Sequence, residues 1–245
     1  MQSVARIAVW SGPRNISTAL MRAWSSRRDT VVLDEPLYGC YLKATGIDHP
    51  GAAEIMAAEP TDWPSALRRM FAALPPGRSI HYHKQMAHHL LPGQDRQWIL
   101  RLCNALLIRN PAEMLASLSR VLPRPTLEQT GLPQQVELLH MLRKQTGETP
   151  PVIDARDVLE HPHGMLTALC QSLGVAFDEA MLSWPTGPQP TDGIWGQHWY
   201  ENLWRSTGFE PYRPKPIDLP DELRPLLTEC ERLYAELYAQ RLTRD

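Results

Sequence analysis

The chain has 245 residues, a hydrophobic fraction of 43% and a formal net charge of −2. These values are typical of a globular protein with a large core. They exclude a generally basic surface for nucleic acid or for an anionic membrane. The four cysteines are widely spaced and form no C-x-x-C pair, so neither a disulfide framework nor a zinc knuckle is expected. No signal-peptide-like or membrane-spanning apolar run is found, and we expect a cytoplasmic protein.

Short apolar segments alternate with segments of helical periodicity along the chain. Strands are predicted at 4–10, 30–33, 79–83, 105–108 and 151–154. Helices are predicted at 17–26, 67–74, 111–122, 134–145, 162–173 and 221–242. Asp62-Trp63-Pro64 resembles a helix cap that leads into 67–74, and Asn110-Pro111 caps the helix at 111–122. Unalternated apolar strands separated by helices are typical of a parallel sheet covered on both faces. The sequence therefore predicts one α/β domain over residues 1–245, with three layers of helix, sheet and helix.

The first predicted strand leads into the sequence Ser11-Gly12-Pro13-Arg14-Asn15-Ile16-Ser17-Thr18. A strand that turns through Gly-Pro-Arg into a Ser-Thr helix start makes an anion site. Backbone N–H groups of the first helical turn, the helix dipole and Arg14 all favour negative charge there. The loop is not a Walker loop, because it lacks the second glycine and the lysine of G-x-x-x-x-G-K-[ST].

Other candidate site residues follow the remaining strands. Glu35, Lys84 and Arg109 each lie at or just after the carboxyl end of a predicted strand, as Arg14 does. Ligands of open parallel sheets bind beyond these ends, so we expect the four residues to converge on one site. Ser117 follows Arg109 by eight residues on the next predicted helix, and both side chains can contact one phosphate.

These two motifs resemble those of the sulfotransferase family. Pro13-Arg14-Asn15-Ile16-Ser17-Thr18 is similar to the family's P-[RK]-S-G-T-T loop, with Asn-Ile in place of Ser-Gly. Arg109 and Ser117 match its Arg and Ser pair, and the segments at 152–159 and 169–175 are similar to its later strand and helix. The resemblance covers roughly residues 4–180. It implies a fold like that of the P-loop nucleoside triphosphate hydrolases, of the sulfotransferase type.

The resemblance also implies a donor and a reaction. The donor is 3′-phosphoadenosine 5′-phosphosulfate, and no metal is needed. Its 5′-phosphosulfate is expected to be bound by Arg14, Asn15, Ser17 and Thr18, and its 3′-phosphate by Arg109 and Ser117. The sulfuryl group would pass to a hydroxyl or amine of a small-molecule acceptor, with Arg14 stabilising the charge on the leaving phosphate oxygen.

Two regions compete to supply the base that the acceptor requires. Glu35 follows the second strand, where some relatives carry a catalytic Glu, and Asp34 is its alternative or a partner of Arg14. The other region is the His-rich stretch 81–89, in which His83 is a candidate base and Lys84 a charge stabiliser. A metal site in this stretch is not favoured, because no carboxylate is spaced to complete it.

The Trp-rich segment 184–210 is expected to pack over the site, with Arg205 contacting a donor phosphate, although packing alone would also explain it. Other functions remain open: a catalytically silent nucleotide-binding protein, a P-loop-like phosphotransferase, or a structural protein without a phosphate site. The sequence identifies neither the acceptor nor the oligomeric state.

Overall fold

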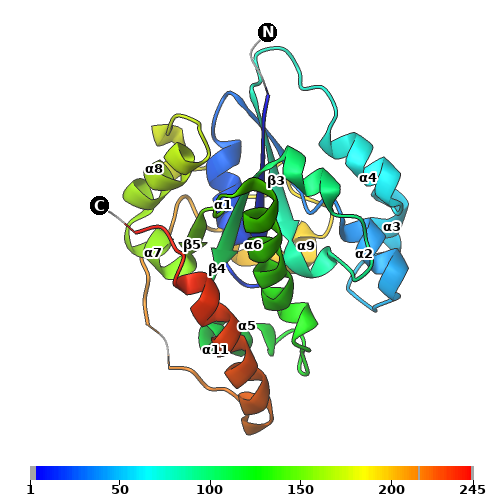
Figure 1. Cartoon of the computed structure of the whole chain (residues 1–245), viewed down its shortest axis with the longest axis vertical. Helices are drawn as coiled ribbons and strands as arrows, with labels where there is room; N and C mark the ends of the chain where they lie inside the picture. The colour runs from blue at the N-terminus through cyan, green and yellow to red at the C-terminus, as the bar shows by residue number, and fades with distance from the viewer. Residues whose placement is uncertain (1–3, 215, 244–245) are drawn as a thin grey trace.

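A computed structural model describes residues 4–214 and 216–243. Its centre is a parallel sheet of five strands in the order β2-β3-β1-β4-β5 (Figure 1). The strands are β1 (Ala5–Ser11), β2 (Thr30–Asp34), β3 (Ile80–Met86), β4 (Cys103–Ile108) and β5 (Val152–Asp154). Because the strands run in one direction, their carboxyl ends share one edge of the sheet, where ligands of such folds bind.

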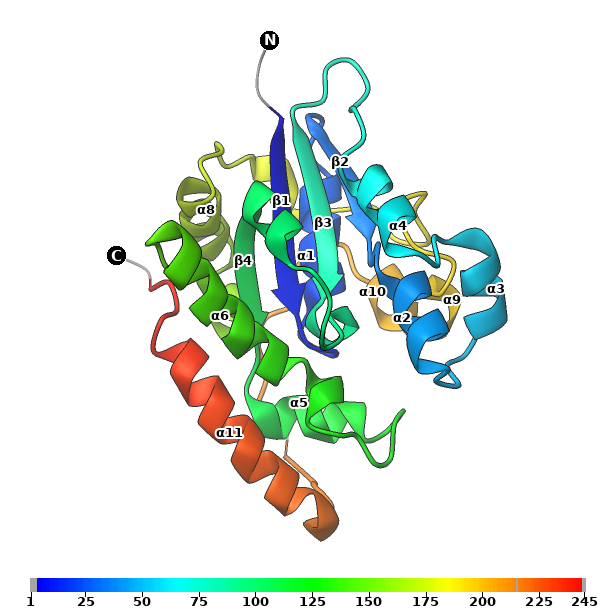
Figure 2. The same ribbon diagram turned by 45° about the vertical axis from the view of Figure 1, so that its right-hand side comes forward.

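Helices cover both faces of the sheet, which confirms the predicted α/β architecture. They are α1 (Ser17–Ser25), α2 (Tyr38–Thr45), α3 (Ala52–Ala58), α4 (Trp63–Met70), α5 (Pro111–Leu118), α6 (Leu132–Thr146), α7 (Ala155–Glu160), α8 (Pro162–Ser172), α9 (Gly196–Trp199), α10 (Glu201–Trp204) and α11 (Arg224–Tyr238). Figure 2 shows α6 and α11 in front of the sheet and α1 behind it.

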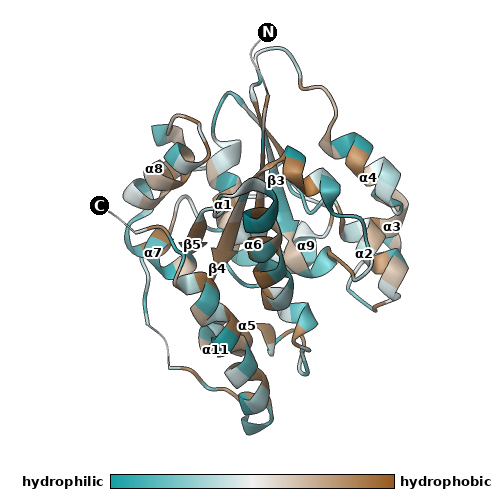
Figure 3. Cartoon of the chain, viewed as in Figure 1, coloured by the Kyte–Doolittle hydropathy of each residue, from teal (hydrophilic) through white to brown (hydrophobic). Residues whose placement is uncertain are grey.

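The burial of β1 explains why its sequence is apolar without alternation. Ile7 and Val9 belong to the hydrophobic core on the α1 face. Ala8 and Trp10 belong to the core on the opposite face, under α6 and α11. A strand buried on both faces needs apolar residues at successive positions. In Figure 3, β4 and β5 are accordingly brown, whereas α11 is mostly teal. Within residues 4–214 and 216–243, no helix combines the length and apolar character that crossing a membrane requires.

Some element boundaries differ from the sequence prediction. β3 continues through Lys84 to Met86, and its seven residues are all buried, although several are polar. α4 begins at Trp63, directly after its N-cap Asp62, whose side chain accepts a hydrogen bond from the backbone N–H of Ser65. The helix start expected from this cap is confirmed, whereas α4 ends at Met70, before the expected residue 74.

Candidate active site

The loop between β1 and α1 contains two residues with left-handed backbone, Arg14 at φ 63° and Ile16 at φ 58°. Gly12 opens this loop where the backbone near residue 130 passes closely. A Cβ atom at Gly12 would lie 2.2 Å from the carbonyl oxygen of Thr130. No side chain caps the N-terminus of α1 at Ile16. The N–H groups of the first turn of α1 therefore have no side-chain acceptor at the cap, which suits the binding of an anion.

Arg14 lies beside other cations rather than beside a carboxylate. Its Nε donates a hydrogen bond to Oγ of Ser117 over 3.0 Å, so the loop and α5 are brought together as predicted. Burial, followed by the charges of Arg109 and Arg120, lowers the pKa of the Arg14 guanidinium. In the part of the chain that the structure describes, Arg14 forms no ion pair with a carboxylate. Clustered arginines with one uncompensated charge attract phosphate or sulfate.

Arg109 supports the backbone of this loop. Its NH1 donates to the carbonyl oxygen of Arg14 over 2.8 Å, and its Nε and NH2 contact Oε2 of Glu113 at 3.1 and 3.0 Å. The other oxygen of Glu113 accepts a hydrogen bond from the hydroxyl of Tyr212 over 2.6 Å. Arg109 therefore stabilises the left-handed turn at Arg14, and its own charge is partly compensated by Glu113.

The remaining loop residues predicted to bind the donor differ in their orientation. Asn15 is buried, and its Nδ2 donates to the carbonyl oxygen of Leu107 in β4 over 3.4 Å. Asn15 thus connects the loop to the sheet. Ser17 is buried at the start of α1, and Thr18 is half-buried beside it. The structure places both hydroxyl-bearing residues in the first turn of α1, next to Arg14.

Lys84 is the centre of a second, buried polar cluster at the same edge of the sheet. Its Nζ donates to Oδ1 of Asp34 at 2.9 Å and to Oε1 of Glu35 at 2.5 Å. It also donates to the hydroxyl of Tyr200 at 2.7 Å. Burial lowers the pKa of Lys84, but the charges of Asp34 and Glu35 outweigh it, so that the pKa lies well above its usual value. Lys84 is thus a permanent cation with all three ammonium hydrogens in use.

Glu35 is the carboxylate of this cluster with the fewest hydrogen bonds. Its backbone has φ 38°, and its N–H donates to the carbonyl oxygen of Lys84 over 3.0 Å. Burial raises the pKa of Glu35, while Lys84 opposes the increase and the charge of Asp34 adds to it. A largely buried carboxylate with a raised pKa is suited to taking up a proton from a bound substrate.

The structure separates the His-rich stretch into two groups. His83 lies with His81, at 4.3 Å between ring centroids, on the face of β3 opposite to Tyr82, which stacks on Trp24 of α1. His83 is therefore not brought to Glu35. His89 is the nearer histidine, with its Nε2 4.0 Å from Oε2 of Glu35. Burial, and then His88, lowers the pKa of His89 well below its usual value, so it is neutral.

The Trp-rich segment contacts the Asp34–Glu35–Lys84 cluster directly. The hydroxyl of Tyr200 donates to Oδ2 of Asp34 over 2.7 Å, and the backbone N–H of Gly193 donates to the same oxygen over 3.1 Å. Nε1 of Trp195 donates to the hydroxyl of Tyr200 over 3.0 Å. The segment therefore lies against this cluster at the carboxyl end of the sheet. The Trp content drew attention to the segment, but nothing in the sequence distinguished Tyr200.

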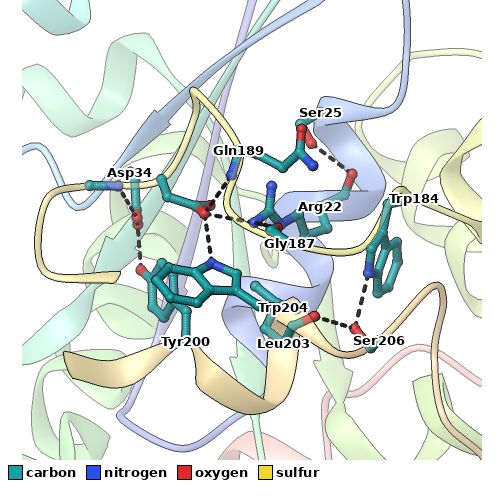
Figure 4. Close-up of polar contacts among 12 residues, drawn as sticks. Arg22, Ser25, Asp34, Trp184, Gly187, Gln189, Tyr200, Leu203, Trp204 and Ser206 are labelled. Atoms are coloured by element: carbon teal, nitrogen blue, oxygen red, sulfur yellow. Dashed lines mark hydrogen bonds and ion pairs between the residues drawn. The ribbon is translucent and has the colours of Figure 1, made fainter. Parts of the chain in front are cut away.

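A buried ion pair attaches the same segment to α1. NH2 of Arg22 lies 2.7 Å from Oδ2 of Asp192, which also accepts a hydrogen bond from Nε1 of Trp204 at 2.9 Å (Figure 4). Arg205, which the sequence analysis assigned to a donor phosphate, instead pairs with Glu201 at 2.5 Å on the exposed surface. The structure does not bring Arg205 to the loop after β1.

Metal coordination was not expected from the sequence. Among the residues with a described position, no three or more His, Cys, Asp or Glu side chains are grouped so that they could hold a metal ion.

The chain is similar in sequence to two curated plant proteins. The chain is 34% identical over 228 residues to the protein named branched-chain-amino-acid aminotransferase-like protein 2 of Arabidopsis thaliana, covering 93% of this chain and 40% of that protein. It is 35% identical over 225 residues to protein 1 of the same name and species, covering 92% and 40%. The chain thus spans about two fifths of the length of these curated relatives.

Solved structures with similar folds are sulfotransferases. The sulfotransferase domain of the Synechococcus PCC 7002 olefin synthase is 17% identical with a TM-score of 0.55, and 99% of this chain and 98% of that chain are covered. The domain from the curacin biosynthetic pathway is 16% identical with a TM-score of 0.55, covering 97% and 99%. The sulfotransferase of Alicyclobacillus acidocaldarius is 13% identical with a TM-score of 0.58, covering 98% of each chain.

These structural similarities support the fold, and a family model supports the relationship itself. The model described as sulfotransferase domain matches residues 5–235, which is nearly the whole chain. The chain belongs to the sulfotransferase domain family.

Proposed function

We propose that this protein transfers a sulfuryl group from 3′-phosphoadenosine 5′-phosphosulfate to a hydroxyl or amine of a small-molecule acceptor. The observation that carries the proposal is the position of an anion-binding loop next to an acid and a lysine. The loop with Arg14 follows β1, and Lys84 lies on the adjacent strand β3, paired in register with Val9 of β1. The uncompensated Arg14 and the uncapped α1 suit the phosphosulfate, and Glu35 suits the acceptor proton.

The proposed donor site divides its contacts between two phosphates. Arg14, Ser17 and Thr18 with the first turn of α1 would hold the 5′-phosphosulfate, while Asn15 keeps the loop attached to β4. Arg109 and Ser117 would hold the 3′-phosphate. A guanidinium has five N–H donors, and the contacts of Arg109 with Glu113 and with the carbonyl of Arg14 use three of them. Arg109 therefore retains N–H groups for a phosphate.

In the proposed reaction, the acceptor oxygen or nitrogen forms a bond to sulfur while the bond from sulfur to the bridging phosphate oxygen breaks. The proton of the acceptor passes to Glu35. The electron pair of the broken bond stays on the phosphate oxygen of 3′,5′-adenosine bisphosphate, where Arg14 and the N-terminus of α1 stabilise it. Lys84 remains charged, and because its three hydrogens are donated within the cluster, it would stabilise the transferring group through its charge alone.

The aminotransferase in the names of the two curated relatives is not the function that this site supports. A lysine that forms a Schiff base must lose its proton to become nucleophilic. Although burial lowers the pKa of Lys84, Asp34 and Glu35 raise it well above its usual value, which opposes that role. A phosphotransferase with a Walker loop is likewise disfavoured, because the loop that starts at Gly12 lacks the second glycine and the lysine of that pattern.

Thermal denaturation with added nucleotide tests the donor assignment. We expect 3′,5′-adenosine bisphosphate to stabilise the protein and ATP with Mg²⁺ not to. Ser117→Ala should weaken binding of the bisphosphate about tenfold, since it removes a hydrogen bond to a charged group. Arg68→Ala, at an exposed position on α4, is the matched control and should bind as the wild type does. Stabilisation by ATP with Mg²⁺ alone would overturn the proposal.

The role of Glu35 is tested separately from donor binding. Glu35→Gln keeps the shape of the side chain but cannot accept the acceptor proton. In a screen of small hydroxyl and amine acceptors, we expect this variant to bind 3′,5′-adenosine bisphosphate normally and to show no sulfuryl transfer. Normal turnover in Glu35→Gln would show that another group is the base. Loss of both bisphosphate binding and sulfuryl transfer would indicate a structural role for Glu35.

A further inference from the structure

The hydroxyl of Tyr200 has only one direction in which it can donate. Its oxygen accepts hydrogen bonds from Nζ of Lys84 at 2.7 Å and from Nε1 of Trp195 at 3.0 Å. Both lone pairs of the oxygen are then in use. The single O–H hydrogen therefore points to Oδ2 of Asp34, 2.7 Å away. Because Tyr200 is 4% exposed, no solvent molecule competes for these contacts.

The two adjacent carboxylates consequently receive different numbers of hydrogen bonds. Asp34 accepts from Lys84, Tyr200 and the backbone N–H of Gly193. Glu35 accepts from Lys84 through Oε1. Within the described residues its Oε2 has no hydrogen-bond donor, and His89 lies 4.0 Å from it. Hydrogen bonds to a carboxylate favour its ionised form. Asp34 is thus stabilised as an anion much more than Glu35 is.

We infer that Tyr200 is a positioning residue of this active site. Its hydroxyl donates a hydrogen bond to Asp34 and so keeps this carboxylate in contact with Lys84, which leaves Glu35 as the carboxylate that accepts a proton. The task of Glu35 as base rests on the function proposed above, whereas the division of charge between the two carboxylates does not. Through the hydrogen bonds of Tyr200 and Gly193 to Asp34, the Trp-rich segment makes the two neighbouring carboxylates unequal, although it lies more than 150 residues further along the chain.

Several other groups face the carboxylate pair from neighbouring elements. Tyr200→Phe does not alter these groups, so their effects are the same in the wild type and in the variant. They are Lys84 on β3, Tyr38 on α2, His89 after β3, Glu59 after α3, Arg22 on α1 and Asp192 in the loop before α9.

The inference is tested by following the two carboxyl groups directly with carboxyl ¹³C NMR during a pH titration of the whole chain. The resonances are assigned with Asp34→Asn and Glu35→Gln. In the wild type, we expect Glu35 to take up its proton above the pH range usual for a glutamate, because its carboxylate has one hydrogen-bond donor among the described residues. In Tyr200→Phe, Asp34 loses a donor and competes better for that proton, so the protonation midpoint of Glu35 should fall by about one pH unit.

Tyr82→Phe is the matched control. Tyr82 is also a buried tyrosine near Lys84, but its hydroxyl has no hydrogen-bond partner among the described residues. This variant should leave the titration unchanged. If Tyr200→Phe does not fold, Trp195→Phe removes the donor that fixes the hydroxyl of Tyr200, and the protonation midpoint of Glu35 should move in the same direction.

Two results would overturn the inference: a protonation midpoint of Glu35 within the range usual for a glutamate in the wild type, or no greater change of that midpoint in Tyr200→Phe than in Tyr82→Phe. The proposed function is tested by a different measurement, the stabilisation of the protein by 3′,5′-adenosine bisphosphate. A chain that titrates as expected but is not stabilised by 3′,5′-adenosine bisphosphate would keep the inference and lose the sulfotransferase assignment.

Discussion

Replacing Lys84 with methionine removes the cation between two buried carboxylates and keeps a side chain of similar length. Nζ of Lys84 lies 2.9 Å from Asp34 and 2.5 Å from Glu35, and the residue is 1% exposed. Removing one partner of a buried ion pair leaves an uncompensated charge, which costs about 3–5 kcal/mol. We expect Lys84→Met to lower the free energy of unfolding by about that amount at pH 8.

This loss should depend on pH in a defined direction. Burial raises the pKa of Glu35 above its unfolded value, while Lys84 opposes the increase, so the variant has a still higher folded pKa. Such a group contributes stability that is fully present below the unfolded pKa and is lost as pH rises through the folded pKa. The unfolded pKa of Glu is about 4.3. Lys84→Met should therefore lose stability from about pH 5 upward.

Urea denaturation at pH 5 and pH 8 measures the effect. Lys43→Met, at an exposed lysine on α2, controls for the substitution itself and should change stability little. Adding Glu35→Gln to Lys84→Met removes one of the two charges and should restore part of the loss at pH 8. The reasoning is refuted if Lys84→Met is equally destabilised at both pH values, or if the double variant is no more stable than the single one.

Three further predictions concern stability and are measured by urea denaturation. Ile16→Gly should be about 1 kcal/mol more stable than Ile16→Ala, because both lose the side chain but only glycine accommodates the positive φ at no cost; equal stabilities would contradict strain at this position. Gly12→Ala should destabilise the protein by more than 2 kcal/mol, on the order of a severe overpacking, because its Cβ would lie 2.2 Å from the carbonyl oxygen of Thr130; a neutral change would show that the loop moves freely. Asp62→Ala should cost about 1 kcal/mol through loss of the cap to Ser65 N–H, and Asp62→Asn, which keeps an acceptor oxygen, should recover most of it.

Much of the fold follows from local sequence patterns. The apolar run of β1 predicts a strand buried on both faces, and the Asp62 and Asn110 caps predict the starts of α4 and α5. These signals are local, because an apolar run and a capping residue are each recognised from a few consecutive residues of the chain. Helices α2, α3, α7, α9 and α10 were not predicted, since they are short and packing rather than periodicity determines them.

The sequence by itself located the anion loop at Arg14, and it placed Glu35, Lys84 and Arg109 at the ends of strands. Parallel strands share one edge, so these residues converge whatever the rest of the chain does. Only the tertiary structure decided that Arg109 holds the carbonyl of Arg14, and that His83 faces away from Glu35 while His89 approaches it. It also decided that Tyr200 reaches Asp34. Contacts between distant segments depend on how the loops pack over the sheet, and residue spacing carries no information about that.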